Sequence, residues 1–212
     1  MKNATTIFIV GLLAGAAGFA LYQHGNVPAP VADAHADTIA VAAKTSIVTT
    51  IPDVSLPNRA GEKQSLRAWP GKSMVINFWA TWCAPCRKEI PLLKEVAKSE
   101  ASSGFQVVGV AIDFRDDVIK YADNIKMDYP ILIGEQEGLA AADAFGVNSA
   151  GLPFTVFTDE KGRIVTIYMG ELTRAKVDTI FSNVKRVNHG ELTPEAARGA
   201  IASKLQSLQK ST

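Results

Sequence analysis

Trp82-Cys83-Ala84-Pro85-Cys86 is the most informative segment of this sequence, and it holds both cysteines of the protein. It follows a strongly β-type run from Met74 to Trp79, and a helix-like segment that ends near Ser99 comes after it. A C-x-x-C at a strand-to-helix junction is far more informative than the same spacing alone. Residues three apart on a helix face the same way, so we expect Cys83 and Cys86 to come within disulfide range.

The start of a helix also affects the chemistry of a cysteine. Unpaired backbone N–H groups and the helix dipole favour a thiolate there, which is the state we predict for Cys83. Pro85, just inside the helix, is tolerated because its missing N–H would have had no partner. The preceding strand, the paired sulfurs and the flanking Trp82 together indicate a reversible dithiol–disulfide pair.

Length and composition limit the other classes of function. The 212 residues leave room for one domain and some appendages, and a formal net charge of +1 gives no basic surplus for binding nucleic acid. Two cysteines so close together cannot stabilise a domain, because the loop that they close is too short. Half of a zinc site is the alternative, but it needs two more ligands, and no metal site is expected because the histidines have no paired ligand spacing. The histidines are His24, His35 and His189.

The N-terminal region predicts export. Lys2 precedes an apolar run from Ile7 to Tyr22, which is long for the core of a signal peptide and short for an ideal spanning helix. We interpret residues 1–24 as an uncleaved signal anchor, with a cleaved signal peptide as the alternative. No Lys or Arg follows until Lys44, so the charge bias keeps the N-terminus inside and exports the rest.

Residues 25–46 are rich in Ala, Val and Pro and have no clean period, so we expect a flexible tether. A domain over residues 47–190 would then hang on the outer side of an inner membrane. Residues 191–212 form a C-terminal helical extension whose thin apolar stripe packs on the domain surface. A contact with a partner or a second copy is the alternative for this stripe. The stripe consists of Ala197, Ile201, Leu205 and Leu208.

Strand-like and helix-like segments alternate along the domain, and their order predicts a mixed sheet with helices on its faces. The last two strands form a hairpin around Asp159-Glu160-Lys161-Gly162. The expected strands lie at 51–56, 63–66, 74–79, 105–113, 131–133, 153–158 and 163–168. The expected helices lie at 83–99, 116–125, 139–145, after Thr173, and at 193–209.

Two parts of the chain together resemble the thioredoxin superfamily, and most closely the membrane-tethered TlpA-, ResA- and DsbE-like thioredoxins of bacteria. The run from Val75 to Pro91 follows their pattern almost residue for residue, and residues 146–153 and 159–162 match its second half. The resemblance implies an α/β, thioredoxin-like fold with a central mixed β-sheet flanked by helices. The N-terminal hydrophobic helix fits the same group, whereas the extra C-terminal helix lies outside the resemblance.

By this resemblance Cys83 is the nucleophile and Cys86 is the resolving thiol. Pro153 would be the cis-proline that lies against the disulfide, and Leu152 before it could pair its backbone with a bound substrate strand. Trp82 and Pro153 would belong to an apolar rim that admits an extended peptide. Trp79 would belong to the same rim. We expect one of the two tryptophans to be an ordinary packing residue and not a contact for the substrate.

The sequence departs from cytosolic-type thioredoxins at two places. Asn77 replaces their buried Asp, so that base is absent, and Glu89, one helical turn beyond Cys86, would take its place. A partly buried carboxylate has a raised pKa and can exchange a proton with the resolving thiol. Phe154 replaces a small or hydroxylated residue, which we expect to reshape the substrate groove.

The implied reaction is dithiol–disulfide exchange on exported proteins, with no metal or organic cofactor. We expect a reductant on the periplasmic side of the bacterial inner membrane, recharged by a membrane-embedded electron donor. Its protein substrates could be apocytochrome c or the thiol pairs of copper or haem sites. A periplasmic disulfide oxidant is the alternative, but it needs a strongly stabilised Cys83 thiolate, and an anionic Glu89 would disfavour that.

Two other classes of function could use the same residues. A thiol peroxidase needs an activating hydroxyl and an Arg around a different loop, and no Pro-x-x-x-Thr-x-x-Cys run is present. A non-catalytic binding module on the same fold would not need both Cys83 and Cys86. The intact pair therefore favours exchange over both.

Overall fold

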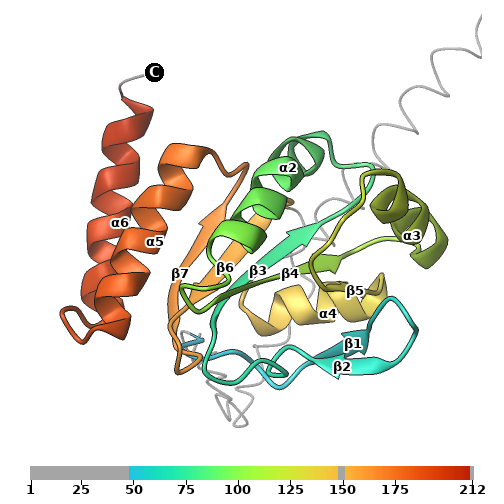
Figure 1. Cartoon of the computed structure of the whole chain (residues 1–212), viewed down its shortest axis with the longest axis horizontal. Coiled ribbons are helices and arrows are strands. Elements are labelled where there is room, and N and C mark those ends of the chain that lie inside the picture. Colours follow the sequence, from blue (N-terminus) through green and yellow to red (C-terminus); the bar gives the residue numbers. More distant parts are fainter. Residues whose placement is uncertain (1–47, 148–150, 211–212) are drawn as a thin grey trace, which may run out of the picture. The chain divides into compact units, whose positions relative to one another are not determined.

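A five-stranded mixed sheet forms the centre of the structure, a computed structural model that describes residues 48–147 and 151–210 (Figure 1). The strand order is β5-β4-β3-β6-β7; β3, β4 and β5 are parallel to one another, and β6 is antiparallel to both of its neighbours, β3 and β7. These strands are β3 (Ser73–Trp79), β4 (Phe105–Ala111), β5 (Ile131–Ile133), β6 (Phe154–Thr158) and β7 (Ile164–Met169). A separate antiparallel pair consists of β1 (Ser55–Pro57) and β2 (Lys63–Ser65). The expected mixed sheet is confirmed.

Helices cover both faces of this sheet. Alternate side chains of β3 point to opposite faces, so Val75 and Trp79 pack with α2, α3 and α5, whereas Ile76 and Phe78 pack with α4 and β1. This burial on both faces explains why β3 reads as an almost unbroken apolar run. The helices are α2 (Ala84–Ser99), α3 (Arg115–Asn124), α4 (Gln136–Ala144), α5 (Arg174–Asn188) and α6 (Pro194–Gln209).

The end of β4 differs slightly from the prediction, and the difference matters for the site. We expected a strand as far as Asp113, but β4 ends at Ala111, which pairs with Trp79 at the end of β3. Ile112 still donates its N–H to Trp79 O at 2.9 Å, and Asp113 then turns its carboxylate toward Thr81. The segments that follow β3 and β4 therefore leave the sheet side by side.

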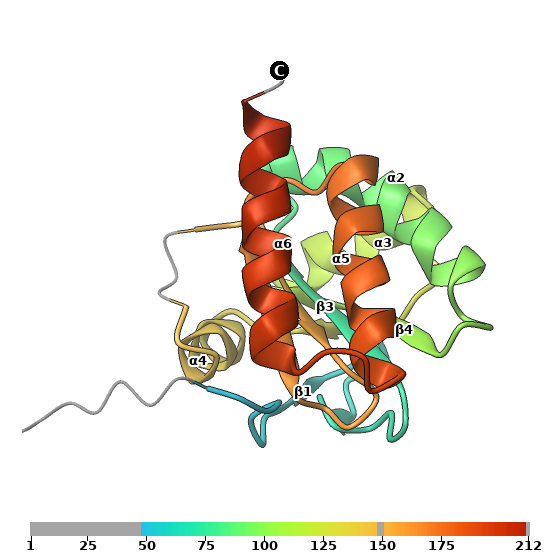
Figure 2. The same cartoon turned by 90° about the vertical axis from the view of Figure 1, so that its left-hand side faces the viewer.

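Helix α6 lies alongside α5 and covers the outer edge of β7 (Figure 2). Ala197 and Ile201 are fully buried, as the predicted packing of this stripe requires. Arg198 donates from Nε to Val165 O at 3.1 Å and from Nη2 to Ile164 O at 2.9 Å. The guanidinium thus satisfies edge carbonyls that would otherwise be open to another strand.

The expected signal anchor or signal peptide at 1–24, the whole of the expected tether at 25–46 and the first residue of the expected domain lie outside the described residues. None of the described helices has both the length and the hydropathy needed to cross a membrane.

Candidate active site around the Cys83–Cys86 disulfide

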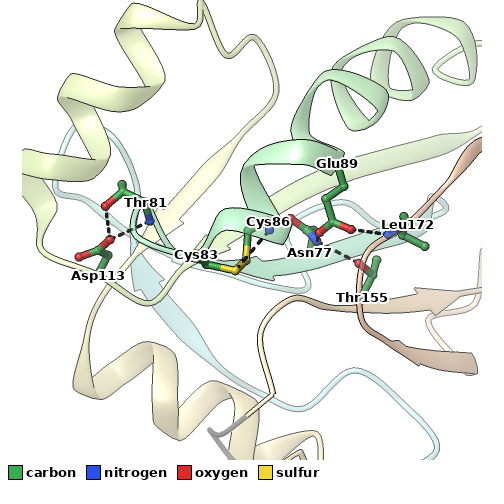
Figure 3. The surroundings of a disulfide bond; sticks show 8 residues. All are labelled: Asn77, Thr81, Cys83, Cys86, Glu89, Asp113, Thr155 and Leu172. Carbon is green, nitrogen blue, oxygen red and sulfur yellow. Dashed lines mark hydrogen bonds between the residues drawn. A yellow bond between two sulfur atoms is a disulfide. The ribbon is translucent and has the colours of Figure 1, made fainter.

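Cys83 and Cys86 form a disulfide at the N-terminus of α2, with their sulfur atoms 2.00 Å apart (Figure 3). Cys83 is the N-cap residue, and its Sγ accepts a hydrogen bond from Cys86 N at 3.3 Å. Pro85 occupies the first turn, where no N–H partner is required. The donor that faces Cys83 Sγ is the kind of unpaired helix-start N–H that stabilises a thiolate.

The Leu152–Pro153 peptide bond is cis, as the resemblance implies. Pro153 directly precedes β6, and Phe154 pairs with Phe78 near the end of β3, from which the cysteine turn departs. Pro153 O accepts from Gly170 N at 2.8 Å. The backbone N–H and C=O of Leu152 make no hydrogen bond within the described residues.

Phe154 was expected to reshape the substrate groove, and this expectation is wrong. Its side chain is only 1% exposed and stacks on Phe78, with ring centroids 4.3 Å apart. Because Phe154 points into the core on the α4 side, the larger side chain fills the interior and does not line the surface.

Glu89 is buried on α2, with 1% of its surface exposed. Its Oε1 accepts from Asn77 Nδ2 at 2.7 Å, and its Oε2 accepts from Leu172 N at 2.7 Å (Figure 3). Burial raises the pKa of Glu89 to about 7, although both hydrogen bonds act to lower it. A carboxyl group with this pKa can take up or release a proton near neutral pH.

Asn77 connects Glu89 to β6. Its Nδ2 donates both to Glu89 and to Thr155 Oγ1, the latter at 3.0 Å, and all three side chains are buried. An amide cannot titrate, so Asn77 fixes the direction of the Glu89 carboxyl without competing for its proton.

The two tryptophans of the predicted rim have different environments. Trp79 is fully buried and packs against Tyr121, with ring centroids 5.7 Å apart, so it belongs to the core. Trp82 is 67% exposed beside Cys83. The prediction that one of the pair is packing is therefore correct.

Sequence reasoning missed two further exposed apolar side chains, at the ends of β4 and β7. Among the described residues the exposed large hydrophobic side chains are Trp82, Phe114 at 62% and Met169 at 49%. Phe114 follows the end of β4, and Met169 pairs with Phe154, next to the cis-proline. A position just beyond the carboxyl end of a parallel strand is where ligand sites gather, and for Phe114 that was the available signal.

Asp113 was also missed, and it lies on the other side of the disulfide from Glu89 (Figure 3). Its Oδ2 accepts from Thr81 N at 2.8 Å and from Thr81 Oγ1 at 2.5 Å, and its Oδ1 accepts from Phe114 N at 2.8 Å. The side chain is nearly covered, with 6% of the residue exposed. No group of three or more His, Cys, Asp or Glu side chains in the described ranges could hold a metal ion.

Comparisons with known proteins agree with this geometry. A family model described as the AhpC/TSA family matches residues 47–167. The thioredoxin-like protein YneN of Bacillus subtilis (strain 168) is 36% identical over 133 residues, which are 60% of this chain and 74% of that protein. The thiol-disulfide oxidoreductase ResA of Geobacillus thermodenitrificans (strain NG80-2) is 29% identical over 145 residues, 67% of this chain and 81% of that protein.

A solved structure is similar as well. The crystal structure of a thiol:disulfide interchange protein of the thioredoxin family from Chlorobium tepidum TLS has a TM-score of 0.55 and 32% identity. The match covers 61% of this chain and 91% of that one. The resemblance to thioredoxin-like oxidoreductases is confirmed, and the site is consistent with the thiol-disulfide oxidoreductase activity for which the relatives are named. The chain therefore belongs to the AhpC/TSA family and has the thioredoxin-like fold.

Proposed function

We propose that this protein catalyses thiol–disulfide exchange on exported proteins through Cys83 and Cys86, acting as a reductant. The observation that carries the proposal is the disulfide at the start of α2 with a buried carboxyl group, Glu89, on the same helix. The cis peptide before Pro153 also supports the proposal, because the resemblance to thioredoxins implies a cis-proline at this position.

In the proposed reaction the reduced enzyme begins with a Cys83 thiolate. This thiolate attacks one sulfur of a substrate disulfide, the substrate S–S bond breaks, and the other substrate sulfur leaves as a thiolate. Cys86 then attacks Cys83 Sγ, which releases the second substrate thiolate and forms the Cys83–Cys86 disulfide. Two electrons pass from the enzyme to the substrate.

Glu89 would manage the proton of Cys86 in this cycle. Cys86 must lose its proton to attack, and a buried carboxylate with a pKa of about 7 is suited to accept it near neutral pH. The anionic form of Glu89 also disfavours a nearby thiolate. That effect raises the thiol pKa and makes the pair more reducing, which supports a reductant over the alternative of an oxidant.

The surface around the disulfide suits an extended polypeptide. Leu152 can offer its unpaired N–H and C=O to a substrate strand, as in β-strand addition. Trp82, Phe114 and Met169 are the large exposed apolar side chains of the described residues, and we expect them to contact side chains on either side of a substrate cysteine.

The cellular setting of this activity is also part of the proposal. An N-terminal anchor, or a cleaved signal, would place residues 47–190 on the periplasmic side of the bacterial inner membrane. There a membrane-embedded electron donor would reduce the disulfide again. Substrates could be apocytochrome c or the thiol pairs of copper or haem sites, and the names of the ResA relatives are compatible with an exchange activity of this kind.

Trapping tests the proposal directly. With Cys86→Ser, a mixed disulfide between Cys83 and the substrate cannot be resolved, so it should accumulate in the cell envelope and disappear on treatment with dithiothreitol. Cys83→Ser is the matched control and should trap nothing. Equal trapping by both variants, or none by either in a strain that exports the protein, would contradict the proposed chemistry.

A further inference from the structure

The turn that carries the cysteines and the turn that follows β4 leave the sheet next to each other. Trp79 and Ala111 are register partners at the ends of two parallel strands. Beyond them the main-chain ladder contributes one more hydrogen bond, from Ile112 N to Trp79 O. After that point only side chains can hold the two turns together.

Asp113 provides this connection. One carboxylate oxygen accepts both the N–H and the hydroxyl of Thr81, and the other accepts the N–H of Phe114. Hydrogen bonds to a charged acceptor are stronger than neutral ones, and a covered group that loses its partner pays the full desolvation cost. These bonds fix the backbone of the cysteine turn at Thr81 and the backbone of the turn after β4 at Phe114.

Each turn presents one large apolar side chain to solvent directly after its bond to Asp113. Trp82 follows Thr81, and Phe114 follows Asp113, with 67% and 62% of their surfaces exposed. Exposed aromatic residues that sit on a rigid backbone lose little conformational entropy when a partner binds, so they are efficient contact residues.

We propose that Asp113 is a positioning residue that holds Trp82 and Phe114 as one preformed apolar contact surface for the protein substrate. This inference rests on the proposed exchange activity and adds a determinant of substrate affinity. The polypeptide that fits such a surface carries apolar side chains near the cysteine to be reduced. A small disulfide reaches the sulfur atoms without touching this surface.

Asp113→Asn is an informative variant because the new side chain has nearly the same shape as the old one. The amide has one acceptor oxygen, so it cannot accept from Thr81 N and Phe114 N through different atoms, and its NH₂ must face one of these donors. We therefore expect this variant to release one turn from Asp113. Thr81→Val is milder, because it removes the hydroxyl bond and retains the bond from Thr81 N.

The matched control is Asp159→Asn in the β6–β7 turn. Asp159 is also a buried carboxylate, and it accepts from Lys161 N at 3.0 Å and from Arg163 N at 2.8 Å. It lies at the hairpin end of β6, whereas the cis-proline precedes the other end of that strand. Any general effect of loosening a buried Asp should appear in this variant as well.

The test compares two substrates, insulin as a protein disulfide and hydroxyethyl disulfide as a small one. For Asp113→Asn we expect KM for insulin to rise roughly tenfold, the equivalent of one lost charged hydrogen bond, with kcat and the rate on hydroxyethyl disulfide unchanged. Thr81→Val should raise the same KM by a smaller factor of about three. Phe114→Ala should reproduce the rise with Asp113 intact, and Asp159→Asn should leave all constants at the wild-type values.

Two results would overturn the positioning role. One is an unchanged KM for insulin in the folded Asp113→Asn and Thr81→Val proteins, and the other is an equal loss of rate on both substrates. If Asp113→Asn does not fold, Thr81→Val and Phe114→Ala decide the question by the same criteria. A wild-type protein that reduces neither substrate would instead contradict the proposed function itself.

Discussion

Glu89 and Asp113 are two buried carboxyl groups that flank the same disulfide, and they differ in what surrounds them (Figure 3). Glu89 lies on the helix side and receives one hydrogen bond at each oxygen, from Asn77 and Leu172. Asp113 lies at the ends of β3 and β4 and receives bonds from two backbone N–H groups and one hydroxyl. The same chemical group therefore sits in two distinct environments within one site.

The difference shows how surroundings assign a role to a carboxyl group. Around Glu89 the loss of hydration outweighs the two donors, and the pKa rises to about 7, so this group is suited to exchange a proton. The donors of Asp113 belong to the backbone of two adjacent turns, so its bonds determine where those turns lie. We therefore assign proton transfer to Glu89 and positioning to Asp113.

The largest effect is expected for Glu89→Gln, on the rate at which Cys86 forms the disulfide. Glu89→Gln keeps an acceptor for one donor but cannot take a proton, so we expect the Cys86 step at pH 7 to slow by about 10²-fold, the usual contribution of general acid–base catalysis. Stopped-flow measurement of disulfide formation within the enzyme would show it. Asp113→Asn should leave this step within about twofold. Equal slowing in both variants would remove the distinction.

The pH dependence of folding stability tests the same contrast without a substrate. The pKa of Glu89 is near 4.5 in the unfolded chain and about 7 in the folded one, so the folded state binds more protons between these values. Its contribution to stability is therefore fully present below pH 4.5 and is lost as the pH rises through 7. We expect a loss of roughly 3 kcal/mol over this interval in urea titrations of the oxidised protein.

The same titration on variants identifies the source of the slope. Glu89→Gln should flatten the stability profile between pH 4.5 and 7, because the residue that binds the extra proton is gone. Asp113→Asn should lower the whole curve and keep the slope. A slope that survives in Glu89→Gln would assign the proton to another group.

Asn77→Asp tests how far the neighbouring side chain controls the pKa of Glu89. The change replaces a donor to Glu89 with a second acid, and two adjacent carboxyl groups cannot both ionise easily. We expect the higher apparent pKa of the pair to lie about one unit or more above that of Glu89 alone. The infrared carboxyl band followed across pH measures it, and an unchanged midpoint would mean that the Asn77 contact does not influence the acid.

The smallest expected effect on stability belongs to Trp82. Its side chain is 67% exposed, so Trp82→Ala should change the free energy of unfolding by no more than about 0.5 kcal/mol. It should also leave the pH slope of Glu89 intact. A loss as large as that expected for a core residue would mean that Trp82 supports the turn and is not simply a contact residue.

Sequence patterns predicted much of this architecture, for identifiable physical reasons. The pattern of apolar residues predicted the strands, and the C-x-x-C at the start of α2 predicted the disulfide. Both signals lie within a short stretch of sequence. The burial of Glu89 could also be anticipated, since helical spacing places it on the side of Cys86. Phe154 was misjudged because its position next to Pro153 does not reveal which face of β6 it occupies.

Asp113 and Phe114 could not be found in the same way. Their importance depends on the parallel pairing of β3 with β4, which joins residues about thirty positions apart through the register of Trp79 with Ala111. The residues near Asp113 in the sequence do not indicate that Thr81 is its hydrogen-bond partner. A signal of this kind becomes visible only once the strand order is known.

The reduction potential of the Cys83–Cys86 pair shows whether this pair acts as a reductant. Equilibration with dithiothreitol or glutathione buffers, followed by thiol alkylation and mass measurement, gives the potential at pH 7. For a reductant we expect a reversible two-electron couple at about −200 mV or lower, which a membrane-embedded donor can keep reduced. A value near the roughly −120 mV of a strong periplasmic oxidant would contradict the assignment as a reductant.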